Sequence, residues 1–205
     1  MLAALMGGKA LPAGELAYRA GVTFQTASSH LRILETSGFI RAIKCGRHRY
    51  YELTNQNIAE GLETLASSLL VKLPSIPPHL SLARFCYDHL AGQLAVMITQ
   101  KLISHGAITL NNCAFECHQG HDHLWCQFSL NLNTVRATNR KFAPRCIDWS
   151  QRQPHIAGAV GAALATSLQD LHYIVRSPND RAVNITPLGQ MFFDQFLGKG
   201  WQDAE

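Results

Sequence analysis

The first forty residues carry two amphipathic helical patterns separated by a short turn. The stretch AGELAYRAG (13–21) predicts a short helix ending at Gly21, because glycine suits the left-handed turn that closes many helices. Thr23 is a favourable N-cap for a second helix, which is expected to stop at Ser37 and Gly38. The residues that recur at helical spacing within it are Ala27, His30, Leu31 and Leu34.

Two strand-like runs follow, FIRAIKC (39–45) and HRYYELT (48–54), joined by a turn that contains Gly46. Runs rich in β-branched and aromatic residues on either side of a glycine predict a β-hairpin. Helical periodicity returns over 56–72. The prolines of LPSIPPH (73–79) then predict a linker, because proline lacks the backbone donor that a continuing helix needs.

After this break the chain repeats a pattern. CYDHLAGQLAVMITQKLISHGAI (86–108) and the later segment CIDW…PHIAG…LHYIV (146–175) share a Cys-x-Asp step, a His-x-Ala-Gly step and a long apolar helix. We expect a β-rich stretch to close each copy, WCQFSLNL (125–132) in the first and RAVNIT (181–186) in the second, where Pro187 opens a terminal helix. Repeated units of this kind bury their apolar faces against each other.

The predicted fold class is therefore α+β, mainly α with small β-hairpins. Residues 1–72 are expected to form a winged helix-turn-helix and residues 73–80 a Pro-rich linker. Residues 81–205 are expected to form a sensing and dimerisation domain, built from two repeated helix-hairpin units at 81–135 and 140–205.

Two helices followed by a hairpin with a basic tip point to DNA binding. A helix fits the major groove, where polar side chains reach base edges, while arginines on a wing contact phosphates or the minor groove. The same domain used only for protein contacts is the alternative. The predicted DNA-binding residues are Thr23, Gln25, Thr26, Ser28, Ser29, His30 and Arg32 on the second helix and Arg47, His48 and Arg49 on the wing.

The stretch LPAGELAYRAGVTFQTASSHLRILETSGFIRAIKCGRHRYYEL closely resembles the ArsR-type winged-helix repressors. It matches their recognition helix with S-x-H-L, their glycine-led entry to the wing and their R-x-[RY]-Y-x-L wing over about the first 65 residues. The motifs CYDHLAG, CIDWSQRQPHIAG and ITPLG resemble a longer subgroup of these regulators. The family usually dimerises through a helix ahead of this stretch and the helix after the wing. Since Met1 lies inside that first helix, either the chain start is misplaced or dimerisation relies on 56–72 and the C-terminal domain.

Composition and charge agree with a DNA-binding protein. The net charge is +4, and residues 1–60 alone hold seven Lys and Arg against four Glu, a net charge of +3. No apolar run approaches the roughly 20 residues of a membrane span, and the N-terminus lacks a signal-peptide pattern, so we expect a cytoplasmic protein without a membrane partner. The sequence has no phosphate loop, GxSxG or HExxH motif, and we expect it not to be an enzyme.

NNCAFECHQGHDHLWC (111–126) concentrates potential metal ligands. Thiolates and imidazoles suit Zn²⁺ or Cu⁺, and this segment is the candidate site for such an ion, although no cofactor is certain. A His-rich hairpin with cysteines packed as small hydrophobic residues is the alternative. The candidate ligands are Cys113, Cys117, His118, His121, His123 and Cys126.

The repeat supplies a second constellation. Pseudo-twofold packing of the units would bring equivalent residues together around a small effector pocket, or would place Cys86 near Cys146 as an oxidisable thiol pair. The alternative is structural: Asp88 and the residues before Pro154 would begin and cap helices. The predicted pocket residues are Cys86, Tyr87, Asp88, His89, Cys146, Asp148, Trp149 and His155.

Together these patterns predict a homodimeric repressor of double-stranded operator DNA. An effector sensed in the C-terminal domain would release it from an inverted-repeat operator. The effector would be a small molecule, a metal acting at 113–126, or an oxidant acting on Cys86 and Cys146. A thiol enzyme or an adaptor that uses a borrowed winged helix is the alternative of another class.

Overall fold

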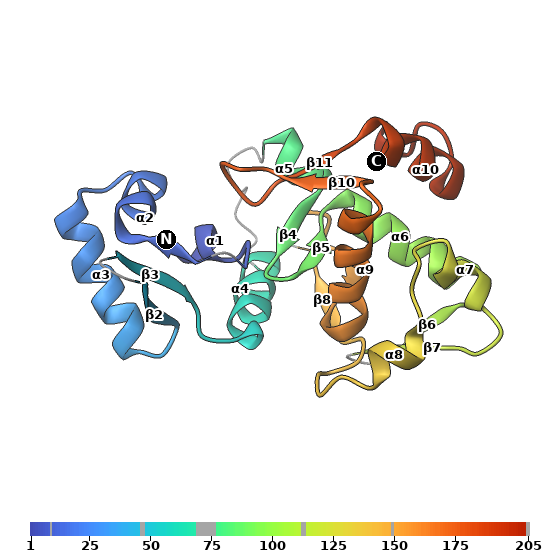
Figure 1. Ribbon diagram of the computed structural model, residues 1–205, viewed down its shortest axis with the longest axis horizontal. Helices are drawn as coiled ribbons and strands as arrows, with labels where there is room; N and C mark the ends of the chain where they lie inside the picture. The colour runs from blue at the N-terminus through green and yellow to red at the C-terminus, as the bar shows by residue number, and fades with distance from the viewer. Residues whose placement is uncertain (9, 46–47, 69–76, 112–113, 149, 204–205) are drawn as a thin grey trace.

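The computed structural model describes residues 1–8, 10–45, 48–68, 77–111, 114–148 and 150–203 (Figure 1). About half of the chain is helical, and the strands form one three-stranded and four two-stranded antiparallel sheets within these ranges. The predicted α+β class with small hairpins is confirmed. No helix in the described ranges has the length and hydrophobicity to span a membrane.

The N-terminal part is a winged helix-turn-helix. Its sheet has the order β1-β3-β2, with the β2–β3 hairpin in register from Ile40 opposite Leu53 to Cys45 opposite His48. The elements are α1 (Leu2–Leu5), β1 (Leu11–Pro12), α2 (Ala13–Ala20), α3 (Phe24–Thr36), β2 (Ile40–Cys45), β3 (His48–Leu53) and α4 (Gln56–Ser68).

Local sequence signals account for the two helices of this motif. Gly21 closes α2 in the left-handed conformation, with φ 64°. The Thr23 hydroxyl accepts a hydrogen bond from the Thr26 N–H at 3.2 Å and so caps α3. Ala27 and Leu31 are fully buried, which fixes the inward face of α3 as the periodicity predicts.

The C-terminal part contains two copies of one unit, each a hairpin, a long helix, a second hairpin and a further helix. The first copy is β4 (Arg84–Cys86), β5 (His89–Ala91), α6 (Gln93–Ser104), β6 (Ile108–Asn111), β7 (Ala114–Cys117) and α7 (Asp122–Cys126). The second is β8 (Arg145–Ile147), β9 (Pro154–Ile156), α9 (Gly158–Asp170), β10 (Ile174–Arg176), β11 (Val183–Ile185) and α10 (Pro187–Leu197). The remaining elements are α5 (Pro78–Leu82), α8 (Leu132–Arg136) and a 3₁₀ turn (Trp201–Asp203).

The two copies exchange contacts across their junction. Helix α6 packs against β9 of the second copy. Helix α9 packs against β5 of the first (Figure 1). The glycine of each His-x-Ala-Gly step has a positive φ, 90° at Gly92 and 66° at Gly158. A Cβ on Gly92 would lie 2.8 Å from the Ser81 carbonyl oxygen, so only glycine permits this approach. The repeated motif therefore encodes the turn from hairpin into helix.

Two expectations about this part were wrong in detail. WCQFSLNL (125–132) is not β-rich: it covers the end of α7 and a turn, and the hairpin of the first copy is β6–β7. Asp88 and the residues before Pro154 do not begin helices but lie in the β4–β5 and β8–β9 hairpins. The predicted linker 73–80 lies partly outside the described residues, and α5 occupies its end.

Two hydrophobic cores hold the structure together. One surrounds α6 and α9 and includes Phe85, Trp125 and Phe193, each at most 1% exposed. The other joins Leu31 and Leu53 of the winged helix to Cys86, Ala91, Cys146 and Ala157 of the repeat hairpins. Because this second core contains residues of both parts, the hairpins of the C-terminal part pack directly against the winged helix.

Candidate functional site

The outer face of α3 presents polar side chains to solvent. It follows α2 after the turn at Gly21, and its inward residues are those of the core described above. His30, which the periodicity left ambiguous, lies on the solvent face. All seven residues predicted on this helix and its cap are exposed: Thr23, Gln25, Thr26, Ser28, Ser29, His30 and Arg32.

The wing is tied to the C-terminal end of α3. Arg49 donates to both carboxylate oxygens of Glu35, at 2.6 and 2.8 Å, and its guanidinium lies 5.3 Å from the centre of the Tyr51 ring. Arg49 is still more than half exposed, so it remains open to a phosphate. Arg47 and the side chain of His48 lie outside the part of the chain that the structure describes.

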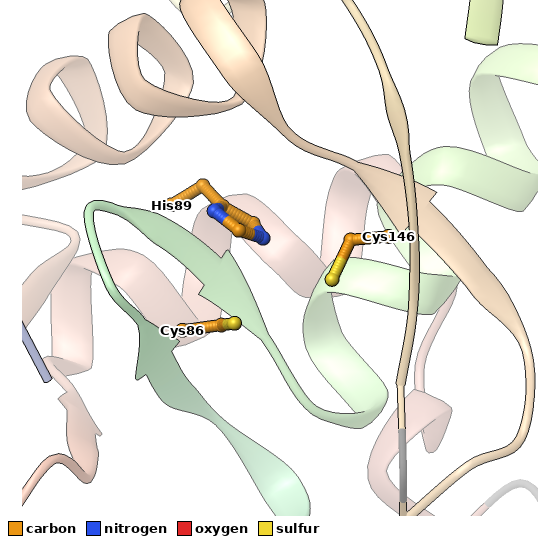
Figure 2. A group of neighbouring side chains, drawn as sticks. All are labelled: Cys86, His89 and Cys146. Atoms are coloured by element: carbon orange, nitrogen blue, oxygen red, sulfur yellow. The ribbon is translucent and has the colours of Figure 1, made fainter. Parts of the chain in front are cut away.

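Cys86, His89 and Cys146 converge at the junction of the two repeats (Figure 2). One ring nitrogen of His89 and the two sulfur atoms all lie within 4.8 Å of one another. Cys86 pairs with His89 across the β4–β5 hairpin, and Cys146 pairs with His155 across β8–β9, so two equivalent hairpins build the cluster. The structure thus brings Cys86, His89 and Cys146 together, as the repeated pattern predicts.

His155 adjoins this cluster. Its ring centre lies 5.2 Å from that of His89, with the two planes inclined by 31°. Both imidazoles are fully buried. Among the residues that the structure describes, neither ring nitrogen of either histidine has a hydrogen-bond partner; the Nδ1 of His89 lies 3.6 Å from a carboxylate oxygen of Asp88. Buried polar atoms are rarely left in this state without a ligand or water.

The titratable groups of the cluster are buried and lie close enough to shift one another's pKa. Contact with Cys146 and burial raise the pKa of the Cys86 thiol well above its usual value. Burial opposes the charge on His89, but Cys86 and the Asp88 carboxylate outweigh it and raise the pKa of His89 to about 9. Burial and the charge on His89 lower the pKa of His155 to about 3. His155 is therefore a neutral imidazole at physiological pH.

A buried ionic network surrounds the cluster. Asp148, fully buried, accepts from the Arg84 guanidinium at 2.8 Å and from the Gly92 N–H at 2.6 Å. Burial would raise the pKa of Asp148, yet Arg84 outweighs it and keeps that pKa far below its usual value. Glu63 of α4 enters the same network, 3.8 Å from Arg84 and 3.2 Å from Arg181.

A second link runs along the edge of the cluster. Arg140 donates to Asp88 at 2.7 Å and to the side-chain oxygen of Gln56 at 2.7 Å. Gln56 is the first residue of α4, which directly follows the wing. The cluster is thus connected to two points of α4, to its first residue Gln56 and to Glu63 in its middle.

Most of the predicted effector-pocket residues that the structure describes are buried. Cys86, His89 and His155 are 0% exposed and Cys146 is 3% exposed, so their side chains occupy the space between the hairpins. Tyr87 is partly buried, and its N–H donates to the Met6 carbonyl; Trp149 lies outside the described residues. A cavity of about 130 Å³ lies elsewhere, lined by Arg19 of α2 and Arg176 of β10 among others. The groups that the cluster itself offers, two thiols and two imidazoles, are ligands for a metal ion.

The structure does not bring together those predicted ligands of segment 111–126 that it describes. Cys117 is buried, and burial raises its pKa to about 11. The His118 Nε2 lies 2.9 Å from the Thr109 hydroxyl. The rings of His121 and His123 are 6.2 Å apart, Cys126 is exposed, and Cys113 lies outside the described residues. Within the described ranges these residues form no group with converging ligand atoms, so this metal site stays a prediction.

Sequence reasoning missed the charged residues that join the domains. Glu63, Arg84 and Arg140 have no motif of their own, and a charged residue in an amphipathic helix is usually solvated. The available signal was Glu63, which falls where the apolar face of the 56–72 helix is expected.

The comparisons agree with the geometry. No family model matches the chain. The chain is 38% identical over 203 residues to the uncharacterized HTH-type transcriptional regulator YdfF of Bacillus subtilis (strain 168), an alignment that spans 96% of this chain and 90% of that protein. This chain belongs to the HTH-type transcriptional regulators. The regulator class accounts for the exposed helix α3, and the similarity extends through the C-terminal part that holds the cysteine–histidine cluster.

Proposed function

We propose that this regulator is an ArsR-type homodimeric repressor, which binds operator DNA through α3 and responds to an effector sensed in its C-terminal domain. The observation that carries the proposal is the solvent-exposed polar face of α3, which the Thr23 cap begins within a winged helix-turn-helix. A twofold dimer would place two such helices about one DNA turn apart, on an inverted repeat.

The shared core supports the sensing role. Cys86 and Cys146 pack in one cluster with Leu31 of α3 and Leu53 of the wing. A structural change at the repeat junction would therefore alter the packing that positions the recognition helix α3. A coupling of about 1–3 kcal/mol is enough to change DNA affinity by about 5- to 150-fold.

The environment of the cysteines argues against a thiol enzyme. A nucleophilic cysteine needs a thiolate that its substrate can reach. Cys86 is fully buried, and contact with Cys146 together with burial raises its pKa well above the usual value. These properties suit a ligand or structural thiol, not a catalytic one.

Binding to DNA from the regulator's own promoter tests the proposal. The full chain is titrated against that DNA and against random DNA over a series of salt concentrations. We expect tighter binding to the promoter, a protected region with two half-sites about 10 base pairs apart, and a steep salt dependence. Equal, salt-independent binding to both DNAs contradicts the proposal, and a monomer bound to a single half-site contradicts its dimeric form.

The wing is tested in the same titration. Replacing Arg47 or Arg49 by Ala should weaken binding to all sequences and reduce the slope of log affinity against log salt by roughly 0.9 for each lost phosphate contact. Arg41→Ala serves as the matched control, because Arg41 pairs with Glu52 at 2.6 Å on the body of the hairpin. An unchanged slope in both wing variants removes the wing from the contact surface.

A further inference from the structure

We propose that Cys86, His89, Cys146 and His155 form a Zn²⁺ site at the junction of the two repeats, and that occupancy of this site controls DNA affinity. The metal site stands on the geometry of the cluster alone. The control of DNA affinity rests on the proposed function.

The first argument concerns the buried ring nitrogens of the cluster. Both ring nitrogens of His89 and of His155 lack hydrogen-bond partners among the described residues, although both side chains are fully buried. Burying an unsatisfied polar group costs free energy, and four such atoms at one place are a heavy cost. A metal ion takes one nitrogen from each ring as a ligand and so relieves the cost for two of the four atoms.

The second argument is the distance between the ligand atoms. In a tetrahedral zinc site, metal–sulfur bonds of about 2.3 Å place two sulfur atoms about 3.8 Å apart. The ligand atoms of Cys86, His89 and Cys146 already lie within 4.8 Å of one another, and their side chains point toward a common centre (Figure 2). His155 is paired with Cys146 across its hairpin and adjoins His89. It lies outside the group of three converging residues, and a turn of its ring toward the ion would complete a Cys₂His₂ set.

The third argument is charge. The two thiols and the protonated ring of His89 each lose a proton to solvent when the metal bonds form, and two thiolates with two neutral imidazoles balance the charge of Zn²⁺. The complex is neutral overall, as its complete burial requires. The Asp88 carboxylate, 3.6 Å from the Nδ1 of His89, is placed to accept the remaining N–H and orient the ring, as carboxylates do in many zinc sites.

The same residues connect the metal site to the winged helix. Asp88 is held by Arg140, which also binds Gln56 at the start of α4. A metal that draws His89 and Cys146 together moves the Asp88 hairpin and the β8 strand, and β8 packs against α4. Since α4 directly follows the wing, the domain that contacts DNA is displaced with it.

Cobalt is the probe for the metal site, because Co²⁺ in a tetrahedral thiolate site has characteristic ligand-field and sulfur-to-cobalt charge-transfer absorption. The full chain is purified under reducing conditions, stripped with a chelator and titrated with Co²⁺ or Zn²⁺. We expect one ion per chain and both absorption features. Cys86→Ser and Cys146→Ser should lose stoichiometric binding, while the matched controls Cys117→Ser and Cys126→Ser should keep it.

Several results would overturn the site. These are the absence of charge-transfer absorption in the parent protein, binding that survives in Cys86→Ser and Cys146→Ser, or binding that is lost in Cys117→Ser instead. A Cys86–Cys146 disulfide in protein isolated without oxygen would also overturn it, in favour of a thiol pair. Should the cysteine variants fail to fold, X-ray absorption of the zinc-loaded parent decides: two sulfur neighbours at about 2.3 Å and two nitrogens at about 2.0–2.1 Å are expected, and a shell without sulfur refutes the site.

Promoter affinity of the stripped and zinc-loaded parent tests the regulatory part. We expect a change of about 5- to 150-fold. One bound ion with unchanged promoter affinity overturns the regulatory part and keeps the site. Failure of both forms to prefer the promoter refutes the proposed function, and the cobalt spectrum still reports on the metal site.

Discussion

Asp148 of the second repeat accepts a hydrogen bond from the backbone N–H of Gly92 in the first repeat, at 2.6 Å. Gly92 is the residue before α6, so a side chain of one copy holds the turn that leads into the long helix of the other. The second copy thus supplies the carboxylate that the Gly92 N–H and the Arg84 guanidinium of the first copy share.

Asp148→Ala should destabilise the fold strongly. The carboxylate is fully buried and also holds Arg84, so its loss leaves a buried guanidinium without its closest acidic partner. We expect a loss of about 3–5 kcal/mol in the free energy of unfolding, measured by urea denaturation. Asp170→Ala, at an exposed position of α9, is the control and should change stability by less than about 0.5 kcal/mol. Equal effects of the two would contradict the role of Asp148 in joining the two copies.

Gly161→Ala should loosen the repeat junction. A Cβ at this position of α9 would lie 2.5 Å from the Ile156 carbonyl oxygen and 3.1 Å from the Cβ of His89. We expect a loss of about 1–3 kcal/mol in thermal or urea unfolding, from overpacking. Gly61→Ala in α4, where a Cβ meets nothing within 4 Å, is the matched control and should stabilise the protein by about 0.4–1 kcal/mol. A neutral Gly161→Ala would show that the helix is not pressed against the hairpin.

Cys126 and Cys117 should differ in their reaction with iodoacetamide at pH 8, read by mass spectrometry. Burial raises the pKa of Cys117 to about 11, so only about a thousandth of it is thiolate at that pH, whereas Cys126 is exposed. Cys126 is expected to react much faster. Rapid labelling of both would contradict the burial of Cys117. Joint protection of both by added zinc would favour a metal site in 113–126.

Arg140→Ala should separate sensing from DNA binding. Arg140 bridges Asp88 and Gln56 but supplies no ligand atom to the cluster. We expect the variant to bind one Co²⁺ per chain and to show a smaller ratio of promoter affinities between its stripped and zinc-loaded forms. Arg145→Ala, at an exposed position on β8, is the control. If the affinity ratio is unchanged in Arg140→Ala, this bridge does not transmit the signal.

The sequence predicts the winged helix well and the cluster only in part. Gly21, Thr23 and Leu31 act within a few residues of their position, so their patterns can be read locally. The strands β5 and β9 are only three residues long and mostly buried, so they lack the alternation that marks a strand. The density of ligands in 111–126 directed attention away from Cys86 and Cys146, which are far apart in the chain and meet only through the packing of the repeats.

The central claim, that the exposed face of α3 reads operator bases, is tested most directly by measuring how base preference changes in Gln25→Ala and Ser29→Ala. Promoter fragments with single base-pair changes are titrated with each variant, with Thr36→Ala at the other end of α3 as the control. We predict that each of the two variants loses discrimination of about 1–3 kcal/mol at particular base pairs and keeps it elsewhere, while the control behaves like the parent. Uniform weakening across all fragments, or unchanged preference in both variants, would contradict the claim.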